Sequence, residues 1–243
     1  KGTGEIIYNK QENQDLNTII ANQSFTQNNQ FVCDKSKAHS ISVINCQFTN
    51  IESEKAIYID WEKISIYITR SVFISCNRAS NGVIMLNRAR CLTMTHVCTN
   101  ECGGDGESGV LNYDCMDEDF SFCLYNTFVN SRTSNGDNSF NIYIRSGNQF
   151  YRCNNLTVTN KGGFHFSAPQ CFSFAMTTAM KCGGSCFQFS GYQNAENCAF
   201  DKTIEMVNFF SSHKYLFKLS GECAFKLTIL NSVLLNSDKD AQF

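Results

Sequence analysis

Short stretches of alternating apolar and polar residues recur along this chain. Seven four-residue segments share the pattern apolar, any, apolar, polar: "IYID" (57–60), "IMLN" (84–87), "LNYD" (111–114), "IYIR" (142–145), "FHFS" (164–167), "FQFS" (187–190) and "FKLS" (217–220). Successive segments begin 22 to 31 residues apart. Alternation with a period of two is typical of a β-strand with one buried face. The pattern therefore predicts a strand that returns once in every repeat.

Two further families of segments accompany the first. One precedes it by about ten residues and includes "CQFTN" (46–50), "SVFISC" (71–76) and "SVLLNS" (232–237). A less regular family lies before that and includes "CLTMT" (91–95) and "CAFKLTI" (223–229). Each coil of such strands buries one face only, so the coils must stack to close a core. We therefore expect an all-β fold, a right-handed parallel β-helix of about seven to eight coils, with three short strands in each coil of 22–31 residues.

This fold predicts two inward columns of apolar residues from the first family. The expected pairs are Ile57/Ile59, Ile84/Leu86, Leu111/Tyr113, Ile142/Ile144, Phe164/Phe166, Phe187/Phe189 and Phe217/Leu219. We expect residues 1–39 to form an N-terminal capping segment that leads into the helix, with a possible short α-helix near 15–22. Residues 40–243 would form the β-helix, which would continue or dock beyond the C-terminus. The structural alternative is a β-sandwich of short, regularly spaced strands.

Two of the repeats resemble a known family. "SVFISCNRASNGVIML" (71–86) and "CQFTNIESEKAIYI" (46–59) are similar to the repeats of the Cys-rich polymorphic outer-membrane-protein (Pmp-like) family of chlamydial and trichomonad surface proteins. In that family an F-x-x-N or F-x-x-C element precedes a G-G-A-I-like strand. Here "FISC" stands for the first element, and "NGVI" and "KAIY" stand for the second. The resemblance implies a surface-exposed or secreted β-helix associated with adhesion.

Charge and hydropathy narrow the range of partners. The chain has 20 basic and 22 acidic residues and a net charge of −2, without a basic stripe, which gives no electrostatic support for nucleic-acid binding. No run of 18 apolar residues could span a membrane, so no span is expected in this chain. Because it begins at Lys1 with no signal peptide, we expect a processed chain or part of a longer protein.

Cysteine is unusually abundant, with 14 residues, which favours an oxidising, extracellular or cell-surface location with disulfides. The sequons at Asn22 and Asn155 agree with secretion. Placing the repeats in register suggests three stacked cysteine pairs: Cys76 with Cys102, Cys123 with Cys153, and Cys198 with Cys223. Stacked coils are about 4.8 Å apart, within the Cα separation of a disulfide. Each pair could therefore be a disulfide or part of a ladder of reduced thiols.

Metal sites have little support in the sequence. A zinc site would need Cys98 and Cys102 to meet Cys182 and Cys186, but the repeats place these two pairs three coils apart. The densest acidic stretch is either a solvated loop or a calcium-binding loop; it contains Asp114, Asp117, Glu118 and Asp119. No cofactor is expected.

Catalysis is not expected either. The N-T-D, D-D, G-H-G and R-I-K signatures of polygalacturonase-like enzymes are absent, and the four histidines fall at unmatched repeat positions. The favoured hypothesis is a non-catalytic surface module with a structural or adhesive role, which binds a protein or a glycan. Outward Tyr58, Tyr143 and Trp61 could stack on sugar rings. The alternatives are a filament or coat protein that stacks its coils end to end on copies of itself, and a polysaccharide lyase or hydrolase of the pectin-degrading β-helix type.

Overall fold

The fold was determined from a computed structural model of the chain. The structure describes residues 7–8, 16–26, 31–32, 38–52, 55–60, 62–77, 82–104, 108–115, 121–129, 131–133, 138–144, 148–151, 154–155, 158–159, 162–167, 171–175, 178–182, 187–190, 200–205, 208–211, 217–220 and 225–236. Side chains are described mainly between residues 17 and 129. The described residues contain strands and turns and no helix, and hence no helix that could cross a membrane.

Within the described residues, thirty strands form three sheets. Sheet A has ten: β1 (Ile7–Tyr8), β2 (Leu16–Ala21), β5 (Ala38–Ile44), β8 (Ser65–Thr69), β11 (Cys91–Thr95), β15 (Ser121–Leu124), β19 (Asn148–Tyr151), β23 (Cys171–Ala175), β26 (Phe200–Glu205) and β29 (Phe225–Leu230). Sheet B has twelve: β3 (Ser24–Thr26), β6 (Gln47–Thr49), β9 (Val72–Ile74), β12 (Cys98–Asn100), β13 (Gly103–Gly104), β16 (Thr127–Val129), β17 (Ser131–Thr133), β20 (Asn154–Asn155), β21 (Val158–Thr159), β24 (Thr178–Cys182), β27 (Asn208–Ser211) and β30 (Val233–Asn236). Sheet C has eight: β4 (Phe31–Val32), β7 (Ile57–Asp60), β10 (Ile84–Ala89), β14 (Ser108–Cys115), β18 (Asn138–Ile144), β22 (Gly162–Ser167), β25 (Phe187–Ser190) and β28 (Phe217–Ser220).

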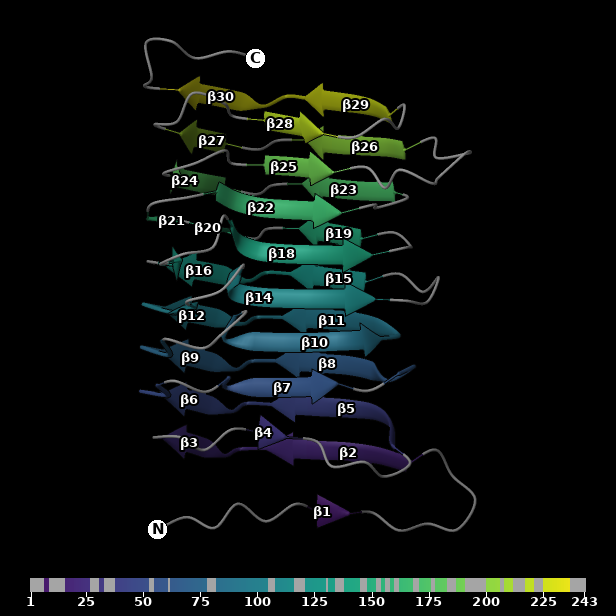
Figure 1. Cartoon of the computed structure of the whole chain (residues 1–243), viewed down its shortest axis with the longest axis vertical. Helices are drawn as coiled ribbons and strands as arrows, with labels where there is room; N and C mark the ends of the chain where they lie inside the picture. Colours follow the sequence, from purple (N-terminus) through teal and green to yellow (C-terminus); the bar gives the residue numbers. More distant parts are fainter. Residues whose placement is uncertain are drawn as a thin grey trace.

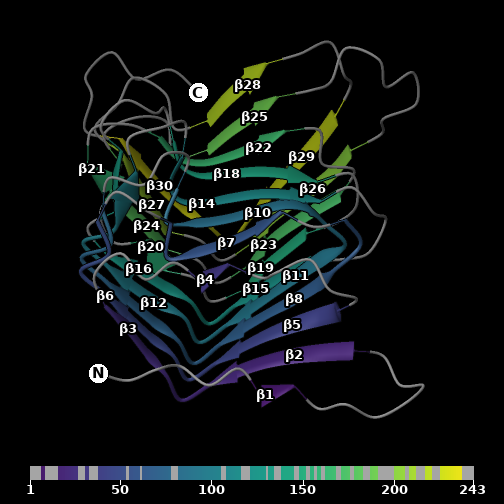
Figure 2. The ribbon, with the colours of Figure 1, turned by 60° about the horizontal axis from the view of Figure 1, so that its bottom comes forward.

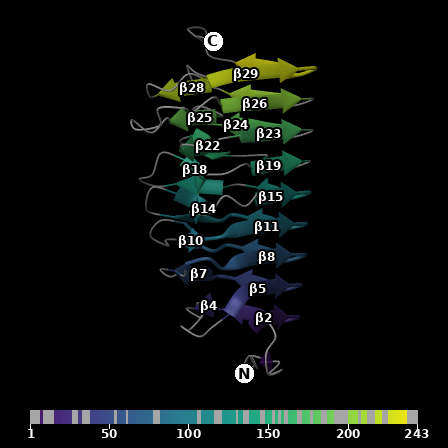
Figure 3. The same cartoon turned by 90° about the vertical axis from the view of Figure 1, so that its right-hand side faces the viewer.

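The chain passes through sheets A, B and C in turn and then returns to sheet A one level higher (Figure 1). Each strand pairs in parallel with the equivalent strand of the next level, and among the described pairs only β1 and β2 are antiparallel. The three sheets form three sides around a common interior (Figure 2), and the strands of sheet A rise as one continuous stack (Figure 3). The protein is therefore a parallel β-solenoid, as the repeats predicted, and not a β-sandwich.

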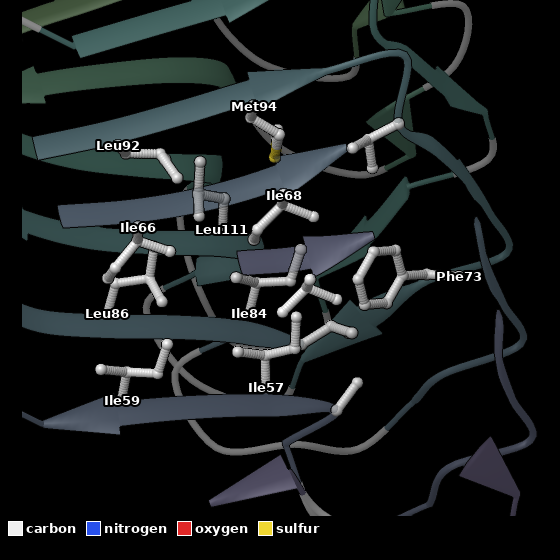
Figure 4. Packing of buried hydrophobic residues seen from close by; sticks show 14 of the residues in the cluster. Ile57, Ile59, Ile66, Ile68, Phe73, Ile84, Leu86, Leu92, Met94 and Leu111 are labelled. Atoms are coloured by element: carbon white, nitrogen blue, oxygen red, sulfur yellow. The ribbon is translucent and has the colours of Figure 1, made fainter. Parts of the chain in front are cut away.

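The interior is filled by the inward columns of the three sheets. Ile57 and Ile59 of β7 lie below Ile84 and Leu86 of β10, and all four are buried. They face the inward residues of sheet A, among them Ile66, Ile68, Leu92 and Met94 (Figure 4). Burying a side chain of this size contributes about 1.5–3 kcal/mol, so the stacked columns supply much of the driving force for folding.

One predicted pair in these columns was wrong by two residues. Leu111 and Tyr113 of β14 pair with Phe140 and Ile142 of β18, whereas the repeat pattern had aligned them with Ile142 and Ile144. The segment "FNIY" (140–143) therefore takes the place expected for "IYIR". A shift of two residues keeps the same face of the strand inward, so the alternating pattern fits both registers equally well.

Sheet B has an aromatic ladder in its inward column. The rings of Phe25 and Phe48 stack at 4.7 Å, and those of Phe48 and Phe73 stack at 4.6 Å. The next level has Thr99, and the level after that has Phe128. Thr99 is fully buried and its Oγ1 has no hydrogen-bond partner. The ladder is therefore interrupted by a hydroxyl group that has lost its contact with water.

The N-terminal boundary of the solenoid differs from the prediction. β2 pairs in parallel with β5, β3 with β6 and β4 with β7, so these first strands already belong to the three sheets. The solenoid thus begins before residue 40, and the α-helix expected near 15–22 is the strand β2. In this first coil the sequence "LNTIIA" (16–21) does not alternate in polarity, because Ile20, which is buried, and Ile19, which is 43% exposed, are both apolar. β1 pairs antiparallel with the lower edge of β2.

Candidate functional site

The outer face of sheet A presents in-register rows of side chains. The central row runs through Ile19, Ser42, Tyr67, Thr93 and Phe122, one residue from each successive strand. Because stacked strands lie about 4.8 Å apart, side chains in a row recur at that spacing along the solenoid. Tyr67, at the centre of the row, is 40% exposed. The face therefore offers a repeating surface to an extended ligand.

Hydroxyl groups occur in both rows beside the central one, at β5, β8 and β11, next to Cys91 in one row and to Ile44 and Leu124 in the other. In one of them Ser40 donates a hydrogen bond to the side-chain oxygen of Asn17, and Ser65 follows in the next strand. In the other row the hydroxyls of Thr69 and Thr95 are 2.9 Å apart and share a hydrogen bond. A hydroxyl can donate one hydrogen bond and accept two, so these rows keep capacity for hydrogen bonds to a ligand.

This face has no charged side chain over most of its length. Strands β2, β5, β8, β11 and β15 contain no Asp, Glu, Lys or Arg, and neither do β19 and β23. The charged residues of sheet A that the structure describes appear in β26 and β29. A surface of this kind offers hydrogen bonds and aromatic contact without selecting an anion or a cation.

A polar corner borders the face where the chain turns from sheet A to sheet B. The described corner residues have left-handed backbone angles, with φ between 46° and 58°; five of them, in the first five coils, are Asn22, Asn45, Arg70, His96 and Tyr125, and the last is Asn231. Asn45 donates to the Asn22 side-chain oxygen at 2.7 Å, and the rings of His96 and Tyr125 stack at 5.1 Å. All five side chains are exposed. The corner thus forms an exposed polar and aromatic margin along sheet A.

The residues behind this corner hold the turn together. Asn126 is fully buried, accepts a hydrogen bond from the Val97 amide and donates one to the Met94 carbonyl, both at 2.9 Å. Ser71 likewise accepts from the Cys46 amide and donates to the Thr69 carbonyl. These bonds satisfy backbone groups that would otherwise be buried without partners.

Sheet C presents a different, charged surface. Arg88 forms ion pairs with Asp60 at 2.9 Å and with Glu62 at 2.8 Å. The Tyr58 hydroxyl donates to Asp60 at 3.3 Å, and the Lys55 ammonium lies 5.1 Å above its ring. Partial burial and the Asp60 carboxylate raise the pKa of Tyr58 above its ordinary value. Tyr58, which the sequence suggested as a sugar-stacking residue, thus already contacts Asp60 and Lys55 of this protein.

Several predicted site residues have no described side chain. Asp114 lies in β14, while Asp117, Glu118 and Asp119 lie outside the described residues. Trp61 also lies outside them, and Tyr143 and Asn155 lie in β18 and β20 without described side chains. Within the part of the chain that the structure describes, no group of three or more His, Cys, Asp or Glu side chains could hold a metal. Asn22 is exposed at the corner, where a sequon would be accessible.

The cysteines with described side chains form no disulfide, and they are Cys46, Cys76, Cys91, Cys98, Cys102 and Cys123. Cys76 and Cys102 occupy equivalent corner positions, because Ile74 pairs with Asn100 two residues earlier. Cys123 lies opposite Phe150, three residues before Cys153. The alignment of "FSFC" with "FYRC" was therefore wrong. Cys153, Cys198 and Cys223 lie outside the described residues, although Phe200 and Phe225, two residues after the last two cysteines, are in register.

The surface residues of sheet A were missed by the sequence reasoning. The less regular family of segments was recognised only from "CLTMT" (91–95) onwards, but "SIYIT" (65–69) and "SISVI" (40–44) have the same alternation. Extending the family downwards would have put Tyr67 and Thr69 on the outer face.

Comparison with known proteins adds nothing to this geometry: no family model matches the chain, and neither curated proteins nor solved structures include a significant match.

Proposed function

We propose that this chain is a non-catalytic adhesive module of the cell surface or extracellular space, which binds a neutral polysaccharide along the outer face of sheet A. The observation that carries the proposal is the uncharged outer face, with the hydroxyls of Ser65 and Thr69 on either side of the exposed ring of Tyr67. Sugars present hydroxyl groups and apolar ring faces, which hydrogen-bonding rows and aromatic rings complement.

A polymer is a better match than a small sugar. The rows repeat with the coil spacing along the solenoid axis, so a polymer lying parallel to the axis meets outward side chains at equivalent positions of every level. The strands of this face between β2 and β23 offer no Lys or Arg to an acidic polysaccharide, and Arg88 is already paired with Asp60 and Glu62. The cysteine content and the resemblance to adhesive surface proteins support an extracellular role.

The test is a binding panel with the full chain. Insoluble neutral polymers (cellulose, chitin and β-glucan) are compared with immobilised pectate and alginate at physiological ionic strength. We expect retention on at least one neutral polymer and little effect of added salt, because no ion pairs form. Binding to the acidic polymers alone, with loss in salt, would contradict the proposal. Release of reducing sugars from a bound polymer would contradict its non-catalytic part.

We also propose the finer description of the fold, a right-handed helix of seven to eight coils. Right-handed crossovers between parallel strands are strongly preferred, which supports the handedness. At a spacing of about 4.8 Å, such a helix rises by roughly 35–40 Å.

End-to-end assembly is a second candidate, and the exposure of Ile229 favours it. Ile229 continues the inward column of Ile20, Val43 and Ile68, which are buried, yet it is 36% exposed. Solution scattering tests the coil number and the assembly together. A particle length set by seven to eight coils at every concentration would contradict assembly, whereas a length that roughly doubles with concentration would support it.

A further inference from the structure

Two cysteines meet inside the solenoid at the corner where the chain leaves sheet B for sheet C. β9 and β12 pair in parallel, and each is followed by a residue with a left-handed backbone, Ser75 (φ 52°) or Glu101 (φ 54°). Cys76 and Cys102 come next, at the same position of successive coils. The shared turn therefore directs both thiols into the core, where they are 1% and 0% exposed.

Backbone hydrogen bonds keep the two coils together across this corner. The Ser75 amide donates to the Asn100 carbonyl at 2.9 Å, and the Gly103 amide donates to the Cys76 carbonyl, also at 2.9 Å. The inter-strand spacing of about 4.8 Å thus extends to the two cysteines and lies within the 4.4–6.8 Å range of Cα separations in disulfides.

The contact between the two thiols shifts their pKa values in opposite directions. The Cys76 thiol lies 3.6 Å from the Phe48 and Ile74 carbonyls, and that of Cys102 lies 3.4 Å from Phe73 and 3.5 Å from Asn100. The thiols also contact each other. A hydrogen bond from Cys102 lowers the pKa of Cys76, while the same contact together with burial raises the pKa of Cys102. Cys76 is therefore the first of the two to ionise.

We propose that Cys76 and Cys102 are an oxidation site, at which a small two-electron oxidant such as hydrogen peroxide closes a disulfide between adjacent coils. The proposal does not depend on the proposed function, because the pair lies in the core at the corner between sheets B and C, and not on the outer face of sheet A.

The chemistry balances with peroxide as the oxidant. The Cys76 thiolate attacks one peroxide oxygen, the O–O bond breaks, and the released hydroxide takes up the proton that Cys76 lost, to give water. The Cys102 thiolate then attacks the sulfenic sulfur of Cys76, the S–O bond breaks, and a second water leaves with the Cys102 proton. Two thiols are oxidised to one disulfide, and one peroxide is reduced to two waters.

Three other cysteines with described side chains have different residues at the equivalent positions of the adjacent coils. Cys46 has Ser71 at the equivalent position of the next coil, whose hydroxyl accepts from the Cys46 amide. Cys98 lies between Val72 and Thr127, and Cys123 pairs with Met94 and Phe150. Among the described residues, Cys76 and Cys102 are thus the only cysteines stacked directly on each other.

The disulfide should link two adjacent coils covalently and stabilise the fold. It closes a loop of one coil, and a loop of this length is expected to raise the thermal midpoint by roughly 6–12 °C in a chain of this size. Because both thiols are buried, the reaction should be slow in the native protein and faster when mild denaturant opens the corner.

The experiment starts from the full chain reduced with a phosphine and then exposed to hydrogen peroxide. Peptide mapping by mass spectrometry without reduction should find the Cys76 peptide joined to the Cys102 peptide, with the loss of two hydrogens. The thermal midpoint should rise after oxidation and fall again after reduction. In Cys102→Ser this rise should vanish, whereas the matched variant Cys46→Ser, which removes a buried thiol with no cysteine above it, should keep it.

Two results would overturn the proposal. One is a peptide map of the wild-type chain in which Cys76 and Cys102 stay reduced, or in which Cys76 proceeds to sulfinic acid, while no linked peptide forms. The other is a rise in midpoint that persists in Cys102→Ser. The wild-type map decides the question even if a variant folds poorly.

Discussion

Thr99 is a polar residue between two aromatic residues in the inward column of sheet B. Its neighbours above and below on the same face of sheet B are Phe128 and Phe73, and its hydroxyl is buried without a hydrogen-bond partner. A buried polar group without a partner costs about 1–3 kcal/mol.

Replacing Thr99 by Val keeps the shape of the side chain and removes the hydroxyl. We expect Thr99→Val to increase the free energy of unfolding by about 1 kcal/mol, measured by urea denaturation. The matched control is Thr127→Val in the adjacent strand, where the side chain points outward and is only half-buried. That control should change stability by less than about 0.5 kcal/mol. A loss of stability in Thr99→Val would show that the hydroxyl has a partner.

The residues at the corner between sheets A and B share one backbone conformation but differ in side chain from coil to coil. Asn22 and Asn45 are joined by a side-chain hydrogen bond, but Arg70 and His96 follow them in the same left-handed conformation. Asparagine tolerates this conformation better than most residues, and the conformation costs an ordinary L-residue about 1–2 kcal/mol. The side chain is therefore free to vary at a moderate cost in stability.

Arg70→Asn should extend the asparagine ladder by one level. We expect a gain of about 0.5–1 kcal/mol, since the backbone strain falls and a further hydrogen bond to Asn45 can form. Arg70→Val places a β-branched residue in the same conformation and should lose about 1–2 kcal/mol. Chemical denaturation of both variants provides the comparison. Equal stability of the two would mean that backbone conformation does not limit this corner.

The existence of most strands could be predicted from the sequence. The pairing register between β14 and β18 and the backbone conformation of the corners could not. Alternation marks which residues of a strand are buried, and Ile57, Ile84 and Leu111 were correctly placed in one column. Alternation is unchanged by a shift of two residues, which explains the wrong register at β18. The first coil escaped notice because it has few apolar residues in alternation and lies at the edge of the stack, where Phe25 is only partly buried.

The candidate site was harder to predict for a physical reason. Inward columns must be apolar, so they repeat from coil to coil and can be recognised; outward rows only need to be compatible with water. Tyr67 therefore looked no different from Tyr58 in the sequence. The distinction between them comes from their neighbours: Tyr58 contacts Asp60 and Lys55, and Tyr67 lies on a face without charges.

At the scale of the coils between residues 17 and 129, charge is separated by face. Here the strands of sheets A and B contain no Asp, Glu, Lys or Arg, while sheet C carries Asp60 and Arg88; further along the chain, charged residues also occur in β26 and β29 of sheet A and in β17 and β24 of sheet B. Uncharged faces without binding function are a liability for solubility, because net charge keeps proteins apart. Maintaining such faces on a solenoid is consistent with a surface that contacts a neutral polymer.

The measurement that tests this account most directly is calorimetric titration of the full chain with a soluble oligomer of the neutral polysaccharide it retains, for Tyr67→Ala and Tyr58→Ala side by side. We predict that Tyr67→Ala weakens binding by about tenfold, since a ring contact contributes roughly 1.4 kcal/mol, and that Tyr58→Ala and Tyr67→Phe bind like the wild type. Unchanged affinity in Tyr67→Ala, or an equal loss in Tyr58→Ala, would contradict a binding site on the outer face of sheet A.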